Sequence, residues 1–95
     1  MEFLKDGVLY NTETSTRIGE PIHFEPSWEE PWVDDYKTLY LSKKKRYYLL
    51  VTSGRSPSCP IDVKVLTNDE ALDWATRYLS VDTVKKHFSD KIKEG

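Results

Sequence analysis

The stretch from Tyr36 to Gly54, YKTLYLSKKKRYYLLVTSG, contains two consecutive strand-like runs joined by a short polar turn. In the first run Leu39 and Leu41 share one face and alternate with polar or aromatic residues, which is the side-chain period of a β-strand. The second run, residues 47–51, is largely apolar on both faces, as expected of a central strand covered on both sides. With its turn within residues 42–46, this stretch predicts a β-hairpin at the centre of a small sheet.

The residues before the hairpin predict further strands separated by a turn. Residues 1–5 are expected to be a loose start, and residues 8–10 (VLY) a short strand. Residues 11–15 (NTETS) favour a turn, because short polar side chains hydrogen-bond their own backbone. Residues 17–20 are expected to return antiparallel to that strand, and residues 22–24 (IHF) to extend the run.

The residues after the hairpin predict a loop, a strand and a helix. Residues 53–60 (SGRSPSCP) are rich in Ser and Pro and predict a mobile loop. Residues 61–66 alternate apolar and polar side chains, which predicts a half-buried strand paired with the hairpin. Residues 67–70 (TNDE) match a capping box, so a helix is expected to begin there and to run to about Leu79.

A second helix is predicted after a cap at Ser80 or Asp82. Its apolar stripe consists of Val81, Val84, Phe88 and Ile92. Strands therefore precede helices, which predicts a single α+β domain with a small antiparallel β-sheet of three to five strands packed by two C-terminal α-helices. The predicted domain covers residues 1–95, with a β-rich half at 8–54, a strand at 61–66 and two helices at 67–93.

Composition and cysteine content bear on the class of protein. Charged residues make up 32% and hydrophobic residues 38%, with three Trp, six Tyr and three Phe, which favours a folded globular domain over a disordered chain. The longest apolar run, residues 47–51, is far too short to span a membrane, and the N-terminus lacks the apolar core of a secretory signal. Cys59 is the single cysteine, which excludes an internal disulfide. These features predict a cytoplasmic protein.

The charges are separated along the chain, although the formal net charge is only −2. Residues 1–36 carry nine acidic and two basic side chains. Residues 37–57 carry six basic side chains and no acidic ones, and the remainder is nearly balanced. Such a separation bears on partners more than on fold.

The segment Glu25 to Asp35, EPSWEEPWVDD, has neither a helical nor a strand period and predicts a surface loop. An exposed tryptophan is a good interface anchor, and the flanking carboxylates would steer it to a protein partner with a basic surface. A nucleic-acid-binding protein is one such partner, because carboxylates can occupy its groove in place of phosphates. The alternative is that both tryptophans fold back over the sheet. The predicted partner-binding residues are Glu25, Trp28, Glu29, Glu30, Trp32, Asp34 and Asp35.

The hairpin turn holds the one dense basic cluster of the chain, Lys43, Lys44, Lys45 and Arg46. Beside Tyr40, Tyr47 and Tyr48, these cations could bind single-stranded nucleic acid, by neutralising phosphates while a tyrosine stacks on a base. The alternative is a solvated turn whose charge opposes aggregation. Electrostatic pairing of this turn with the acidic loop is a further expectation.

Residues for catalysis or metal binding are few. Cys59, His23 and His87 are the candidates for a nucleophile and a base, but nothing in the sequence brings them together. Two histidines and one cysteine at wide separation match no metal-ligand spacing, and no Gly-rich phosphate loop is present. We therefore expect no enzyme activity, no cofactor and no catalytic or metal site.

Three short motifs, in this order along the chain, resemble those of a family of small uncharacterised bacterial proteins often found on phages and other mobile elements. Tyr10 to Ser15 (YNTETS) resembles a Y-[DN]-T-E-T-A turn, and Thr38 to Leu49 resembles a T-L-Y-x-x-K-K-G-x-Y-F-L hairpin. Leu66 to Leu79 resembles an L-T-x-x-E-A-x-x-W-x-x-x-x-L helix start. The chain departs from the pattern at Lys45, where the family tends to have Gly, and in the loop at 25–35.

The resemblance covers roughly residues 8–80. It implies a small sheet-plus-helix domain and transfers no activity or catalytic residue. Together with the small size and the acidic loop, it predicts a non-enzymatic phage or mobile-element inhibitor that occludes a basic surface on a host defence protein, as an anti-CRISPR protein does. The alternative is a single-stranded nucleic-acid-binding protein that uses residues 43–46.

Overall fold

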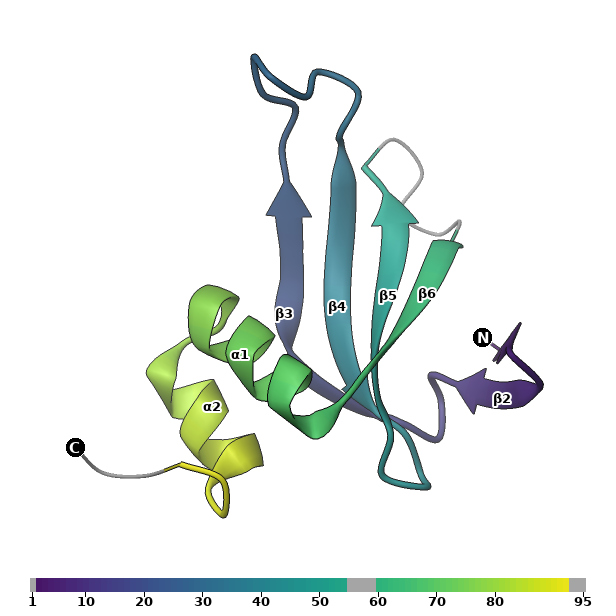
Figure 1. Ribbon diagram of the computed structural model, residues 1–95, viewed down its shortest axis with the longest axis vertical. Coiled ribbons are helices and arrows are strands. Elements are labelled where there is room, and N and C mark those ends of the chain that lie inside the picture. The colour runs from purple at the N-terminus through teal and green to yellow at the C-terminus, as the bar shows by residue number, and fades with distance from the viewer. Residues whose placement is uncertain (1, 55–59, 93–95) are drawn as a thin grey trace.

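The structure, a computed structural model, describes residues 2–54 and 60–92. Its elements in chain order are β1 (Glu2–Lys5), β2 (Val8–Asn11), β3 (Thr16–Phe24), β4 (Asp35–Leu41), β5 (Tyr47–Ser53), β6 (Pro60–Leu66), α1 (Asn68–Tyr78) and α2 (Val81–Phe88). Strands β3-β4-β5-β6 form an antiparallel sheet in that order, and β1 and β2 form a separate two-stranded sheet (Figure 1). The predicted α+β class with two helices near the C-terminus is confirmed.

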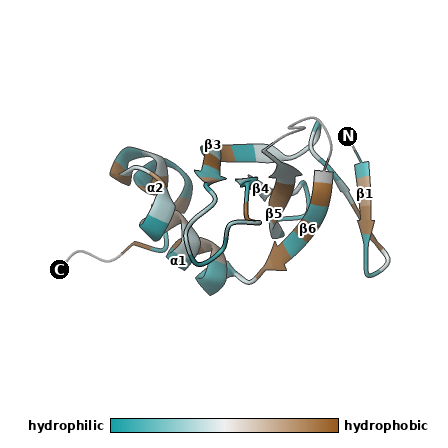
Figure 2. Ribbon diagram, turned by 90° about the horizontal axis from the view of Figure 1, so that it is seen from above, coloured by the Kyte–Doolittle hydropathy of each residue, from teal (hydrophilic) through white to brown (hydrophobic). Residues whose placement is uncertain are grey.

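The predicted hairpin supplies the two central strands of the four-stranded sheet. Leu39 lies opposite Leu49 and Tyr40 lies opposite Tyr48 in the β4–β5 ladder. All residues from Tyr47 to Val51 are buried, so the side chains on both faces of β5 are covered. The two helices cover one face and the β1–β2 hairpin covers part of the other, as the view along the strands shows (Figure 2).

The face under the helices holds the larger core cluster. The capping box of α1 is present: the Thr67 hydroxyl accepts the Glu70 N–H, and the Glu70 carboxylate accepts the Thr67 N–H. Ser80 caps α2 by accepting the N–H of Thr83, which settles the two predicted caps in favour of Ser80. Phe88 of α2 is fully buried and stacks on Tyr47, with ring centroids 5.3 Å apart.

Part of the opposite face is covered by a hairpin that the sequence did not predict. Residues 2–5 form β1 rather than a loose start, and β2 pairs with β1 rather than with β3. This pairing places Tyr10 against Tyr48, with ring centroids 4.9 Å apart. The Tyr48 hydroxyl donates to Ser15 Oγ at 2.7 Å, so the turn after β2 is attached to the central strand. Burial raises the pKa of Tyr48 above its ordinary value.

A bulge in β3 makes room for the junction between the helices. Three residues of β3 lie between Ile18 and Ile22, whereas β4 has one residue, Thr38, between their partners Leu39 and Lys37. Gly19 has φ +76°, and a Cβ at this position would lie 2.9 Å from Leu79 Cδ2. The glycine therefore permits both the turn of the chain and the close approach of the α1–α2 junction.

Some apolar positions of the predicted stripes face water. Val63 is buried, but Ile61 and Val65 on the same strand are exposed, because the β1–β2 hairpin covers only part of that face. On α2, Val84 and Phe88 are buried while Val81 is 69% exposed. None of the helices in residues 2–54 and 60–92 is long and apolar enough to cross a membrane.

Candidate protein-interaction loop

The acidic loop, residues 25–35, connects β3 to β4 and projects beyond the end of the sheet (Figure 1). Both helices and the β1–β2 hairpin lie toward the other end of the strands. Neither the helices nor the β1–β2 hairpin therefore covers the loop. Its last residue, Asp35, is also the first residue of β4.

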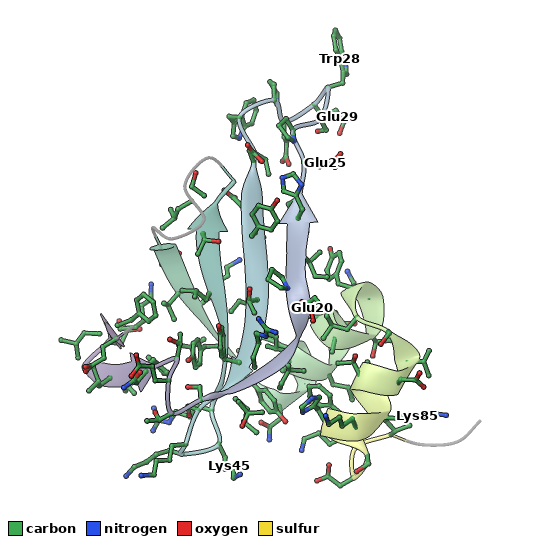
Figure 3. The ribbon with its side chains drawn as sticks, turned by 180° about the vertical axis from the view of Figure 1, so that it is seen from behind. Glu20, Glu25, Trp28, Glu29, Lys45 and Lys85 are labelled. Atoms are coloured by element: carbon green, nitrogen blue, oxygen red, sulfur yellow. The ribbon has the colours of Figure 1, made fainter. Side chains whose placement is uncertain are left out.

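Both tryptophans of the loop are open to solvent. Trp28 is 98% exposed and Trp32 is 76% exposed. Figure 3 shows the Trp28 side chain pointing outward from the tip, away from the sheet. The alternative in which both rings fold back over the sheet is therefore wrong. A large aromatic ring left in water is unusual on a monomer, and such rings mark interaction sites.

A tight turn at the tip determines which side chains point outward. The Ser27 hydroxyl accepts the N–H of Glu30 at 3.0 Å, and the Ser27 N–H donates to the Glu30 carbonyl at 3.2 Å. That carbonyl also accepts the N–H of Val33. Trp28 and Glu29 occupy the two positions between these bonded residues, so the turn presents an indole and a carboxylate side by side.

Contacts between its two ends close the base of the loop. His23 Nε2, near the end of β3, donates to Asp34 Oδ1 at 2.7 Å. The His23 ring is stacked on Tyr36, with centroids 4.5 Å apart and planes 13° apart. The N–H of Gly54 donates to the Asp34 carbonyl at 2.7 Å, and a Cβ at Gly54 would collide with the Asp34 carboxylate. The loop is thus held at its base and open at its tip.

His23 has a structural role at the base of the loop. Its ring, a candidate base in the sequence, is occupied by Asp34 and Tyr36 and also lies 3.7 Å from Glu25 Oε1. His23 and Tyr36 are partners in the β3–β4 ladder. The register of β3 and β4 would have placed His23 beside Tyr36. The bulge after Ile18 shifts this register, so the sequence did not predict it.

The loop carboxylates differ in how far they are engaged. Asp34 is bound to His23, and Glu25 lies near the same ring. Among the described residues, Glu29, Glu30 and Asp35 form no ion pair. The tip therefore carries uncompensated negative charge next to Trp28, which favours a cationic partner surface.

The basic turn, residues 42–46, lies at the opposite end of β4 from the acidic loop (Figure 3). The seven residues of β4 separate the two by about 20 Å. This distance is about two Debye lengths at physiological salt, so electrostatic pairing within one molecule is excluded. The turn closes with a bond from the Ser42 N–H to the Arg46 carbonyl at 2.8 Å, and Lys45 has φ +66°.

A hollow of about 480 Å³, which we call the basic pocket, lies between the basic turn and β2. Its lining includes Val8, Leu9, Tyr10, Lys43, Lys44 and Arg46. No ion pair within the described residues involves the cations of the turn. Tyr47 and Tyr48 are buried in the two cores, so base stacking on these tyrosines is excluded.

The remaining candidates for chemistry are not brought together. His87 lies on α2, remote in the fold from His23 near the end of β3, and Cys59 lies outside the described residues. Burial lowers the pKa of His87, and the neighbouring Lys86 adds to this effect. Within residues 2–54 and 60–92, no group of three or more His, Cys, Asp or Glu side chains could hold a metal ion.

The fold and the loop together define a small α+β domain with an acidic loop that is held at its base and exposes an aromatic–acidic tip. Comparisons of the chain with protein-family models, with curated proteins and with solved structures found no match. The resemblance of the three sequence motifs to a mobile-element family stays a prediction.

Proposed function

We propose that the protein is a non-enzymatic interaction module whose acidic loop binds a basic surface on a partner protein. The exposure of Trp28, 98% at the tip of a loop whose base is clamped, is the observation that carries this proposal. Because the base of the loop is already ordered in the free protein, the loop loses less conformational entropy when it binds, which favours affinity. Glu29 and Glu30 beside the ring supply charge that attracts a cationic surface.

The finer form of the proposal follows the sequence motifs and the small size. In that form the protein is a phage or mobile-element inhibitor that occupies the nucleic-acid-binding surface of a host defence protein, in the manner of an anti-CRISPR protein. The loop offers what such a surface would accept, namely carboxylates in place of phosphates and an aromatic ring in place of a base. We place its site of action in the cytoplasm of the host.

The test is capture of a partner from host lysate with wild-type protein and three variants. Trp28→Ala and Glu29→Lys are expected to abolish capture of the same protein. Glu20→Lys is the matched control, because the Glu20 side chain is 82% exposed on β3, at a distance from the loop (Figure 3). Captured protein should lose nucleic-acid binding when the wild type is added. Equal capture by wild type and both loop variants would contradict the proposal.

A second function is favoured by the basic pocket, in which cations with no ion pair to a described residue lie beside Asn11 and Ser15. This arrangement suits the phosphates of single-stranded nucleic acid. Filter binding at low salt should then retain a labelled oligonucleotide, and Lys43→Glu with Lys44→Glu should release it. Lys85→Glu on α2 is the control of matched charge. If the labelled oligonucleotide is not retained at low salt, nucleic-acid binding is contradicted as the second function.

A further inference from the structure

The two oppositely charged ends of the molecule cannot meet within one chain but can meet between two chains. The acidic loop and the basic turn lie beyond opposite ends of the same strand, β4. Each end also has an apolar component, which is the exposed Trp28 at one end and the wall of β2 at the other. The surfaces are therefore complementary in charge and in polarity.

The basic pocket is suited to a tryptophan flanked by carboxylates. Its volume of about 480 Å³ lies within the range of roughly 300 to 1,000 Å³ that is typical of ligand pockets. Val8 and Leu9 of β2 offer apolar wall, and Leu9 is 58% exposed. Lys43, Lys44 and Arg46 stand at the rim of the same hollow.

A second apolar hollow, of about 430 Å³ between α1 and α2, is a weaker receptor. Its cations are Lys85 and Lys91, and Lys91 is already 3.6 Å from the Asp90 carboxylate. The basic pocket has three cations with no ion pair to a described residue. Charge complementarity to the acidic tip therefore favours the basic pocket.

We propose that Trp28 of one copy inserts into the basic pocket of a second copy, with Glu29 and Glu30 against Lys43, Lys44 and Arg46. Such a contact is head-to-tail and uses two different surfaces, so a pair of copies keeps one unoccupied pocket, on the first copy, and one unoccupied loop, on the second. Because the two surfaces lie at opposite ends of the sheet, the assembly extends along the strand direction. This inference rests on the proposed role of the loop as a docking element, and self-assembly and partner binding then exclude each other at the same loop.

The experiment uses two variants that each block one end. The loop-blocked variant is Trp28→Ala with Glu29→Lys, and the pocket-blocked variant is Lys43→Glu with Lys44→Glu. In sedimentation velocity at low salt, wild type should show a mass that rises with concentration and falls toward one chain in high salt. Each blocked variant alone should stay at the chain mass of 11.1 kDa. Their equimolar mixture should form dimers of twice that mass and nothing larger.

The controls separate this inference from its alternatives. Glu20→Lys and Lys85→Glu carry matched charge changes on other surfaces and should assemble as the wild type does. A monomeric wild type at every concentration and salt would overturn the inference, as would assembly by either blocked variant alone. Loss of assembly in Lys85→Glu would place the contact at the helices instead. Capture of a partner protein by the pocket-blocked variant would still support the proposed function, so the two can fail separately.

Discussion

His23 Nε2 lies 2.7 Å from Asp34 Oδ1 and joins two residues eleven positions apart at the base of the acidic loop. The contact pairs the end of one strand with the residue just before the next, so it sets the direction in which the tip points. Stacking of His23 on Tyr36 fixes the ring from the side of the sheet. The relationship makes the loop a positioned element rather than a free connection.

Asp34→Ala is expected to release the tip while leaving the fold intact. The contact is partly exposed to solvent, and such pairs contribute less than about 1 kcal/mol to the free energy of unfolding. Amide hydrogen exchange in residues 25–34 should become faster, and partner capture should weaken without being abolished. Glu20→Ala serves as the control. Unchanged exchange in the loop would show that the clamp does not hold it.

Trp28→Ala is expected to change the free energy of unfolding by no more than about 0.5 kcal/mol, because the ring is 98% exposed. Phe88→Ala removes a fully buried ring from the helix-side core and should cost about 3 to 5 kcal/mol. Urea unfolding of the two variants measures both values. A loss comparable to that of Phe88→Ala would mean that Trp28 serves folding rather than binding.

The sequence predicted those parts of the fold that depend on local pattern. The hairpin at 36–54 and the capping box at Thr67 follow from periodicity and from a short polar motif, and both are present. The pairing of β1 with β2 was missed because residues 2–5 have a weak pattern, and Phe3 is stabilised by packing against the core cluster that contains Tyr48 and Val63. Such tertiary contacts do not appear in a local window.

The candidate site was predicted in composition but not in geometry. The tryptophans and carboxylates of the acidic loop identified it, yet their exposure depends on the clamp from His23 to Asp34 and on the turn at Ser27. The clamp depends on a strand register that is shifted by a bulge at Gly19. The basic pocket requires the unpredicted β1–β2 hairpin as one wall, so no pattern within the basic turn could have indicated it.

Lys45→Gly is expected to stabilise the protein. Lys45 has φ +66°, a left-handed conformation that costs a residue with a side chain roughly 1 kcal/mol and costs glycine almost nothing. The greater freedom of glycine in the unfolded chain offsets part of this gain, so the midpoint of urea unfolding should rise modestly. Lys44→Gly removes the same charge without a positive φ and should not stabilise. Equal effects of both variants would assign the change to charge instead.

Gly19→Ala is expected to destabilise the protein by about 1 to 3 kcal/mol, through a positive φ and a steric clash. The clash would be with Leu79 Cδ2, 2.9 Å from the added Cβ. A double-mutant cycle with Leu79→Ala, measured by urea unfolding, separates the two causes. The second substitution should relieve the steric part and leave the conformational part. Strict additivity of the two changes would contradict direct contact between the bulge and the helix junction.

The stability of the protein is expected to fall as pH decreases below about 6.5, the ordinary pKa of histidine. Burial, and to a smaller extent Lys86, lowers the pKa of His87, so the folded state favours the neutral imidazole. A group whose pKa is lower in the folded state stabilises it above the unfolded pKa and loses that contribution as pH falls through the folded pKa. The lowered pKa values of Asp62 and Glu70 act in the same direction, but only near pH 4 and below. Urea unfolding between pH 7.5 and pH 5 therefore avoids the range of these two carboxylates, and comparison with a His87→Gln variant identifies the part that belongs to His87. His87→Gln should flatten the curve over this interval, and an unchanged slope would assign the pH dependence to another group.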